Sequence, residues 1–258
     1  MSGAQDAASG RFVGRRALVT GAASGIGRCT AVRLAAEGAS VACLDRNRDG
    51  LEETLTTITG SGGAALPVVC DLQDRAAIPA AVEVAVSGLG GLDVVCNIAG
   101  VGGFWFDEGF PLEEWDRLIA INLTATWLIC QSSLPHLLAT GAGAIVNTAS
   151  TAATDATPYE TAYAATKGAV IALTRSLAIN HAKAGLRVNC IAPGPIKTPI
   201  GLQYGPLEGS DPELIKTIMP FGRLGRPEDV AAVFAFLASD DAAHVNGHVL
   251  KVDGGKRA

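Results

Sequence analysis

The chain of 258 residues has hydrophobic side chains at 48% of its positions and a formal net charge of −5. This composition provides for a substantial core and excludes an intrinsically disordered chain. It has no dense Lys/Arg tract and no run of about 18 apolar residues, which argues against nucleic-acid and membrane partners. The opening residues 1–14 lack the pattern of a secretory signal, so we expect a cytoplasmic protein.

Short apolar runs, typical of buried strands, alternate with longer helical stretches. The strand-like runs lie at residues 16–20, 40–44, 66–70, 92–96, 144–148, 186–191 and 248–252. The helical stretches between them include residues 25–38, 74–90, 112–138 and 160–185. Such repeated βα units predict an α/β fold, a Rossmann-type doubly wound parallel sheet of about seven strands with helices on both faces. No polar linker divides the chain, so we expect one domain over residues 1–258, with residues 1–10 flexible.

The cysteines and histidines do not have the spacing of metal ligands. Most of the six cysteines lie inside apolar segments and none forms a CxxC pair, so we expect reduced thiols in the core. His244 and His248 have helical spacing, but Asn246 and Gly247 between them break a helix. We therefore expect neither disulfides nor a bound metal.

A glycine-rich turn follows the first predicted strand. After Thr20 the chain reads Gly-Ala-Ala-Ser-Gly-Ile-Gly over residues 21–27, and a helix begins directly. Glycines allow the backbone to approach a pyrophosphate closely, and the start of the helix offers free N–H groups to phosphate oxygens. The predicted contacts from this turn are Gly21, Ser24, Gly25, Ile26 and Gly27.

The second predicted strand is followed by Asp45, 18 residues beyond Gly27. A carboxylate there accepts hydrogen bonds from the adenosine ribose hydroxyls and repels a 2′-phosphate, which favours NAD over NADP. Arg46 comes next and would weaken this preference. We predict that both residues contact the cofactor.

Tyr163 and Lys167 share one face of a predicted helix, because their spacing is i, i+4. A phenol with a pKa of about 10 is only about one part in a thousand phenolate at pH 7. Lowering that pKa by two or three pH units requires roughly 3–4 kcal/mol, which a close ammonium and a positive nicotinamide ring can supply. Tyr163 is then a general base for alcohol oxidation or a general acid for ketone reduction. Alone, such a pair is common on helix surfaces.

Five separated motifs occur in order: the glycine turn, Asn97-Ile98-Ala99-Gly100, Ser150, the Tyr163/Lys167 pair and Pro193-Gly194. With these motifs the chain resembles the short-chain dehydrogenase/reductase family, in its single-domain branch of about this length. The resemblance extends from about Arg11 to Gly255. It implies an oxidoreductase that uses a nicotinamide cofactor.

The resemblance also implies roles for four residues. Ser150 matches the serine that polarises the substrate oxygen, and Tyr163 matches the acid/base residue. Lys167 matches the lysine that lowers the tyrosine pKa and grips the nicotinamide ribose. Asn122 matches the asparagine that holds a water in a proton relay to this lysine. Ala149 stands where many relatives have a second serine, and the thirteen-residue spacing to Tyr163 selects Ser150 for the role.

Further cofactor contacts are implied beyond the glycine turn. Asp71 and Leu72 match the pair that contacts adenine, and the segment 193–198 matches the one that orients the carboxamide. The residues implied to line the rest of the cleft are Asn97, Ala99, Gly100, Tyr163, Lys167, Pro193, Ile196 and Thr198.

The substrate end is expected under the segment 197–222, which is rich in Gly and Pro and resembles a mobile lid. Apolar side chains there predict a pocket for a bulky alcohol or ketone: Phe104, Trp105, Phe106, Leu202, Tyr204 and Met219. The alternative for the aromatic cluster is a subunit contact or packing under the loop. Tyr159 is either a substrate contact or an exposed aromatic residue at the start of the helix.

Three functions remain open. The leading hypothesis is an NAD-dependent oxidoreductase for secondary alcohols and ketones. A second is a 3-oxoacyl-thioester reductase, for which the helix after Lys167 supplies only Arg175 and Lys183 as basic residues toward an acidic carrier protein. A third is a non-catalytic dinucleotide-binding protein on the same fold. The resemblance also implies a homo-oligomer, often a tetramer, formed through the helices 112–138 and 160–185 and the C-terminal strand.

Overall fold

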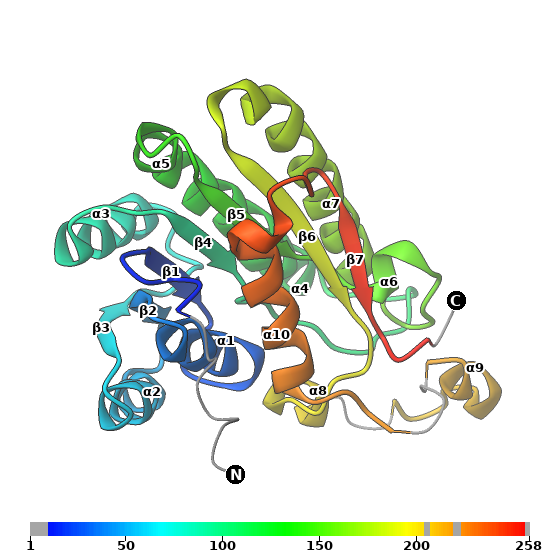
Figure 1. Ribbon diagram of the computed structural model, residues 1–258. Coiled ribbons are helices and arrows are strands. Elements are labelled where there is room, and N and C mark those ends of the chain that lie inside the picture. The colour runs from blue at the N-terminus through cyan, green and yellow to red at the C-terminus, as the bar shows by residue number, and fades with distance from the viewer. Residues whose placement is uncertain (1–9, 204–206, 219–222, 256–258) are drawn as a thin grey trace, which may run out of the picture.

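The computed structural model of the protein describes residues 10–203, 207–218 and 223–255. The expected flexible segment 1–10 therefore lies almost wholly outside the described residues. Within them, seven strands form one parallel sheet in the order β3-β2-β1-β4-β5-β6-β7, which confirms the predicted fold class (Figure 1). The strands are β1 (Arg16–Thr20), β2 (Ser40–Asp45), β3 (Ala64–Val69), β4 (Val94–Asn97), β5 (Ala144–Thr148), β6 (Arg187–Pro193) and β7 (Val249–Val252).

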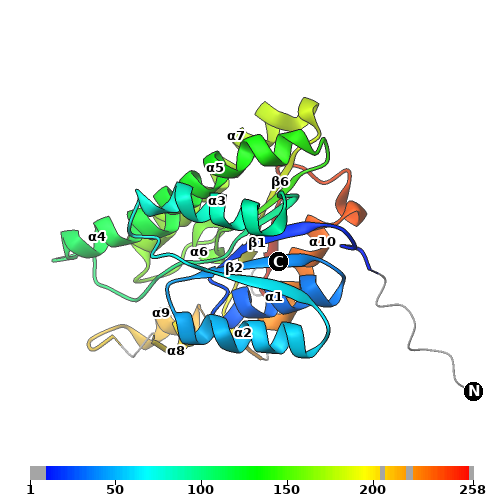
Figure 2. The same ribbon diagram turned by 90° about the vertical axis from the view of Figure 1, so that its left-hand side faces the viewer.

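Helices cover both faces of this sheet. One face carries α1 (Gly25–Ala36), α2 (Arg48–Gly60) and α10 (Pro227–Ala238), and the other carries α3 (Ala77–Leu89), α5 (Ala125–Ala139) and α7 (Thr161–His181). Figure 2 shows the two helical layers on opposite sides of the sheet. Shorter helices lie at the edges: α4 (Leu112–Leu118), α6 (Thr151–Thr154), α8 (Pro199–Gln203) and α9 (Pro212–Lys216).

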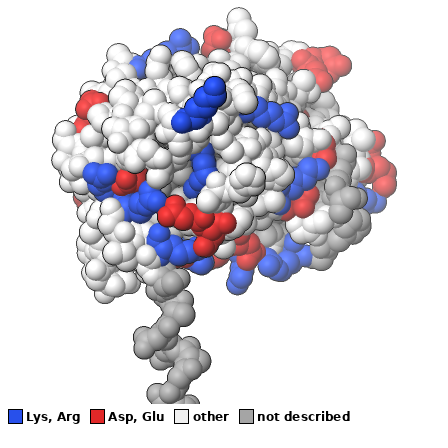
Figure 3. Space-filling view, turned by 45° about the horizontal axis from the view of Figure 1, so that its top comes forward, with Lys and Arg blue, Asp and Glu red and all other residues white. Residues whose placement is uncertain are grey.

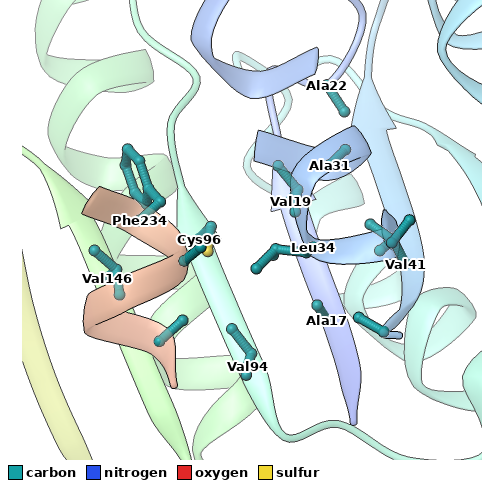
Figure 4. Packing of buried hydrophobic residues seen from close by; sticks show 14 of the residues in the cluster. Ala17, Val19, Ala22, Ala31, Leu34, Val41, Val94, Cys96, Val146 and Phe234 are labelled. Carbon is teal, nitrogen blue, oxygen red and sulfur yellow. The ribbon is translucent and has the colours of Figure 1, made fainter. Parts of the chain in front are cut away.

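The core explains why the strand sequences are continuously apolar. On one face Leu34 of α1 and Phe234 of α10, both fully buried, pack against side chains of the central strands, including Val19, Val94 and Val146 (Figure 4). The opposite face buries a second set beneath α3, α5 and α7. Central strands therefore need apolar residues at successive positions.

Burial on both faces does not extend to the edges of the sheet. Most of β3 is exposed or half-buried, and Val69 at its end is 46% exposed. The strand β7 at the other edge is also only partly buried. The expectation of fully buried strands is wrong for these two, because an edge strand has a neighbour on one side only.

The predicted helix 112–138 is present as one helical run, but it is not α-helical throughout. A π-helical segment, Ile119–Thr124, separates α4 from α5 and contains Asn122. Such a bulge is frequent at functional sites, because the extra residue re-aims side chains within the helix. Periodicity alone does not reveal it, since the apolar pattern continues through it.

The helical run Leu112–Ala139 is also long and apolar enough to cross a membrane by length and composition. Its apolar residues include Ile129, Cys130 and Leu137, which are buried in the core beneath the sheet. Packing of these side chains against the sheet thus accounts for the apolar composition of this helical run, which was not noted from the sequence. On the face shown in Figure 3, basic and acidic side chains are interspersed rather than gathered by sign.

The strand order creates the place for a ligand. The chain proceeds outward from β1 through β2 to β3 and then returns to β4 on the other side of β1. The loops that leave β1 and β4 therefore diverge, and a crevice opens at the carboxyl ends of these strands. The glycine turn follows β1, and the segment Asn97–Gly100 begins at the end of β4.

Candidate active site

A cavity of about 620 Å³ lies at the carboxyl ends of the strands. It is bordered by the turns after β1, β2, β4, β5 and β6 and by the start of α7. Nearly all predicted site residues line it: Gly21, Ser24, Gly25, Ile26, Gly27, Asp45, Arg46, Asp71, Leu72, Ala99, Gly100, Ser150, Tyr163, Lys167, Pro193, Ile196 and Thr198. Among the residues predicted for catalysis or cofactor binding, Asn97 and Asn122 do not line it.

The glycine turn forms a concave cradle that has no room for larger side chains at its glycine positions. Gly21 has φ of +69°, a conformation that favours glycine, and a Cβ on Gly27 would lie 2.0 Å from the Gly21 carbonyl oxygen. Ser24, the residue before α1, makes no side-chain cap hydrogen bond. The first N–H groups of α1 therefore face the cavity with the positive end of the helix dipole, as a pyrophosphate requires.

The turn after β1 is bonded to the turn after β4. The Thr20 hydroxyl oxygen accepts hydrogen bonds from the N–H groups of Ile98 (2.9 Å) and Ala99 (3.1 Å). On the far side, Thr54 donates its hydroxyl proton to the Ala22 carbonyl (2.8 Å). The sequence analysis did not assign these roles to the two threonines. The position of Thr20 as the last residue of a strand was the available signal.

Asp45 both lines the cavity and supports it. One carboxylate oxygen accepts from the Ala23 N–H (3.2 Å) and the other from the Asn47 N–H (3.0 Å). Arg46, 65% exposed, directs its guanidinium toward Asp71, with 3.9 Å between Nη1 and the carboxylate. The positive charge of Arg46 therefore lies close to the negative charge of Asp71 at this end of the cavity.

Asn97, predicted to line the cleft, is not among the residues that border the cavity. Its side chain is buried below the cleft, where it donates to the Asn147 amide oxygen (2.9 Å). Asn147 in turn donates to the Thr174 hydroxyl (3.0 Å), and the Thr148 hydroxyl donates to the Asn97 carbonyl (2.6 Å). Asn97 therefore connects β4, β5 and α7 from beneath and holds the cleft floor.

Asn122 lies behind the cleft wall with both ends of its amide bonded. It accepts from the Val101 N–H and donates to the Val101 carbonyl, each at 2.9 Å, and also donates to the Thr166 hydroxyl (3.2 Å). A Cβ on Gly100 would lie 3.2 Å from the Asn122 amide oxygen and 3.3 Å from Lys167 Nζ. Asn122 and Lys167 thus flank Gly100, which leaves room for both.

Lys167 is almost fully buried and its ammonium donates to the Thr148 carbonyl (3.0 Å). Burial lowers the pKa of Lys167 to about 8, because an ammonium loses its hydration there. The Nζ atom lies 5.8 Å from the centroid of the Tyr163 ring. The lysine is therefore held at the end of β5, beside the phenol.

The phenol of Tyr163 is governed by other neighbours. Burial raises the pKa of Tyr163, the charge of the buried Glu160 raises it further, and a hydrogen bond with Ser150 lowers it. Lys167 was expected from the sequence to lower this pKa, whereas in the structure Ser150 lowers it. Ser150 itself accepts from the Ala152 N–H (3.1 Å), which leaves its hydroxyl proton available for another acceptor. Glu160 was not singled out from the sequence.

The segment after β6 forms the opposite wall. Ile196 pairs with Gly225 in a parallel bridge, and the Gly225 N–H donates to the Pro195 carbonyl (3.0 Å). The Thr198 hydroxyl oxygen accepts from the Gly201 N–H (3.2 Å) at the start of α8. Backbone pairing with Gly225 and the hydrogen bond from Gly201 thus hold this segment in place.

The aromatic residues 104–106 divide between the two interpretations, a wall of the substrate pocket and packing outside it. Phe104 lines the cavity together with Ile200, Ile218 and Leu224, which the sequence analysis did not name. Trp105 and Phe106 pack outside it, Trp105 edge-on to Phe110 and Phe106 edge-on to Tyr159. The predicted contacts from Tyr204, Met219 and the Leu202 side chain lie outside the described residues.

The described residues contain no group of three or more His, Cys, Asp or Glu side chains placed to hold a metal ion. All six cysteines are unpaired and five of them are buried. Burial raises the pKa of the Cys43 thiol to about 12 and that of Cys190 to about 11, so these residues remain neutral core side chains.

Comparison with known proteins identifies the family to which this chain belongs. Residues 21–257 match the family model described as enoyl-(acyl carrier protein) reductase. The chain belongs to the short-chain dehydrogenase/reductase family. It is 40% identical over 245 residues to D-threitol dehydrogenase of Mycolicibacterium smegmatis, which covers 95% of this chain and 94% of that protein.

Two further members of the short-chain dehydrogenase/reductase family are similarly close. Cyclohexanol dehydrogenase of an Acinetobacter species is 40% identical over 247 residues, 95% of this chain and 96% of that one. The crystal structure of a short-chain dehydrogenase from Mycobacterium paratuberculosis bound to NAD superimposes with a TM-score of 0.89 at 31% identity, covering 95% and 98% of the two chains. The chain is thus an oxidoreductase whose relatives act on alcohols and ketones.

Replacement of Gly27 by alanine tests the glycine cradle. The new methyl group meets the Gly21 carbonyl oxygen, so the turn must move and the cradle for the pyrophosphate is lost. We expect the affinity for NADH, measured by fluorescence titration, to fall by about tenfold or more. Gly60→Ala is the control, because a Cβ there meets no atom within 4 Å. Equal NADH affinities in the two variants would contradict the assignment.

Proposed function

We propose that this protein is an NAD-dependent oxidoreductase that moves hydride between nicotinamide and a secondary alcohol or ketone, with Tyr163 as general acid/base. The observation that carries the proposal is that Ser150, Tyr163 and Lys167 share one cavity with the glycine turn and Asp45. Three groups suited to proton chemistry at an oxygen thus lie in the same space as a cradle suited to a dinucleotide.

The residues present fit the dinucleotide in order along the cavity. The turn 21–27 would hold the pyrophosphate, Asp45 the adenosine ribose, and Asp71 with Leu72 the adenine. At the other end Lys167 would hold the nicotinamide ribose, and the wall at Ile196 and Thr198 the carboxamide. When bound, the nicotinamide supplies the hydride acceptor or donor.

The protein side chains handle the proton. During alcohol oxidation the Tyr163 oxygen takes the hydroxyl proton of the substrate, and during ketone reduction it returns one. The Ser150 hydroxyl accepts from the Ala152 N–H and keeps one proton to donate, with which it would polarise the substrate oxygen. Lys167, held by the Thr148 carbonyl, places positive charge beside the phenol and favours the phenolate.

The preference for NAD is supported by Asp45 at the end of β2. Its carboxylate would meet the 2′-phosphate of NADP in a like-charge contact, while Arg46 is drawn toward Asp71. The related M. paratuberculosis dehydrogenase was crystallised with NAD, which supports the same choice.

The substrate end supports a bulky, largely apolar molecule. Phe104, Ile200, Ile218 and Leu224 border the cavity around Ser150 and Tyr163. Relatives named for cyclohexanol and for D-threitol show that ring and open-chain alcohols are both within the family's range.

A second candidate function is reduction of a 3-oxoacyl thioester, favoured by the description of the matching family model. Arg175 on the exposed side of α7 and Lys183, just after the end of this helix, form a sparse basic surface for an acidic carrier protein, so a coenzyme A ester is the better form of this candidate. Turnover of acetoacetyl-CoA with NADH, against a panel of secondary alcohols with NAD, separates the two.

We also propose that the protein is a cytoplasmic homotetramer. The unpaired cysteines support a cytoplasmic location, and the exposed Trp127 on α5 and Ile179 on α7 support subunit contacts through these helices.

Tyr163→Phe tests the proposed mechanism. The variant keeps the ring and loses the oxygen that carries the proton, so kcat for the best alcohol falls by about 10²–10⁴-fold. NADH affinity stays close to that of the wild type, which shows that the fold is intact. Unaltered turnover in this variant would refute the mechanism. Absence of turnover by the wild type on every substrate tested would favour the non-catalytic alternative.

Glu160→Gln tests the electrostatics of the phenol. The carboxylate raises the pKa of Tyr163, so its neutralisation lowers that pKa. Alcohol oxidation needs the phenolate, hence kcat/KM rises with pH, and in the variant this rise moves to lower pH by up to about one pH unit. Glu108→Gln, an exposed residue outside the cavity, is the control and leaves the profile in place. A shift to higher pH in E160Q would contradict the assigned sign.

Asp45→Asn tests the cofactor preference. Asparagine keeps one acceptor oxygen for the Ala23 N–H but removes the charge that would repel a 2′-phosphate. We expect the ratio of kcat/KM with NADP to kcat/KM with NAD to rise by about tenfold or more. The control is Glu52→Gln, which removes the same charge from an exposed position on α2. A wild-type protein that prefers NADP would overturn the assignment to Asp45.

A further inference from the structure

Tyr159 has an uncommon backbone conformation. With φ of +63° it is the one residue other than glycine, among those that the structure describes, that has a positive φ. An aromatic side chain is sterically disfavoured in this region, and such residues persist where the surroundings hold them. Tyr159 lies immediately before Glu160, the N-cap of the helix α7 that carries Tyr163.

The contacts of Tyr159 join three separate segments. Its carbonyl oxygen accepts from the Trp105 N–H (2.9 Å), in the segment after β4. Its phenol oxygen accepts from the Asp211 N–H (2.8 Å), at the residue that caps α9. Its ring stands edge-on to Phe106, with 5.5 Å between centroids and 83° between planes.

These contacts lie behind the substrate end of the cavity. Tyr159 does not line the main cavity, and instead borders a smaller one of about 190 Å³ together with Trp105, Phe110 and Trp115. Neither sequence interpretation of Tyr159, a substrate contact or an exposed aromatic residue, matches this half-buried place.

Each segment that Tyr159 joins does contribute to the main cavity. Phe104 precedes Trp105, Glu160 follows Tyr159, and Ile218 follows α9, and all three line the cavity. Figure 1 shows α9 apart from the long helices that cover the sheet. The phenol–amide hydrogen bond is thus a direct link between the catalytic helix and this outlying part of the cavity wall.

We infer that Tyr159 is a positioning residue, which fixes the α9 segment and the Phe104 segment against the start of the catalytic helix and so sets the size of the substrate end. The inference rests on the proposed function for its consequence in turnover. The phenol of Tyr159 acts through Ile218 and Phe104 and does not touch the reacting oxygen, so it governs substrate fit and not proton transfer.

Tyr159→Phe removes the hydrogen bond to Asp211 and keeps the ring on Phe106. We expect amide hydrogen exchange over residues 213–218 to rise about fivefold, which is the loss of one ordinary hydrogen bond. For the bulkiest alcohol accepted in a panel from propan-2-ol to 4-phenylbutan-2-ol, KM rises about fivefold, while KM for the smallest changes little. The pH profile of kcat/KM stays in place, in contrast to that of the Glu160 variant.

Two substitutions at Asp211 isolate the hydrogen bond. Asp211→Ala removes the capping carboxylate and keeps the N–H, whereas Asp211→Pro removes both, and the native φ of −74° suits proline. Added to Asp211→Ala, Tyr159→Phe should still raise the exchange of residues 213–218 about fivefold. Added to Asp211→Pro, it should have no further effect, because the donor is already absent.

Unchanged exchange over 213–218 in Tyr159→Phe overturns the inference, whatever the activity. A pH profile displaced in Tyr159→Phe also overturns it, because that result would place Tyr159 in the proton chemistry. Absence of turnover by the wild type contradicts the proposed function instead, and the exchange rates then decide the role of Tyr159 by themselves.

Discussion

The hydrogen bonds that the Thr20 hydroxyl accepts from the Ile98 and Ala99 N–H groups join the two turns on which the site depends. The turns after β1 and β4 diverge because the chain reverses its direction across the sheet between them. Without a link they would be independent loops over an open crevice. With it, the glycine cradle and the wall at Gly100 are joined, and Val101, the next residue, is bonded through its N–H and its carbonyl to Asn122.

Burial has opposite consequences for the two central ionisable groups. Removing water lowers the pKa of Lys167, to about 8, and raises that of Tyr163, because in each case the neutral form is favoured. The phenolate needed for alcohol oxidation is therefore not already present in the protein alone. Ser150 lowers the pKa of Tyr163 against burial and Glu160, and in the proposed chemistry the charges of Lys167 and of an oxidised nicotinamide would add to this effect.

Much of the fold followed from sequence, because the strands and helices have distinct hydrophobic periods and each βα unit must cross over in the same hand. The limits appear at particular places. The exposed strand β3 has the same apolar composition as a central one, and the π-helical segment around Asn122 interrupts a pattern that continues without a break. Asn97 was assigned to the cleft from its motif, but its side chain turns inward because Asn147 of the next strand offers it a partner.

The sequence by itself determined the fold class, the glycine cradle and the set Ser150, Tyr163 and Lys167, since each depends on short-range spacing that one strand end or one helix face translates directly into geometry. Tertiary structure alone decided which neighbours control Tyr163, where Lys167 is anchored, and that Phe104 faces the cavity while Trp105 and Phe106 do not. It also decided the place of Tyr159, whose partners Trp105 and Asp211 are 54 and 52 positions away. Contacts of that separation depend on how the loops meet at the carboxyl ends of the strands, and no local pattern in the chain encodes them.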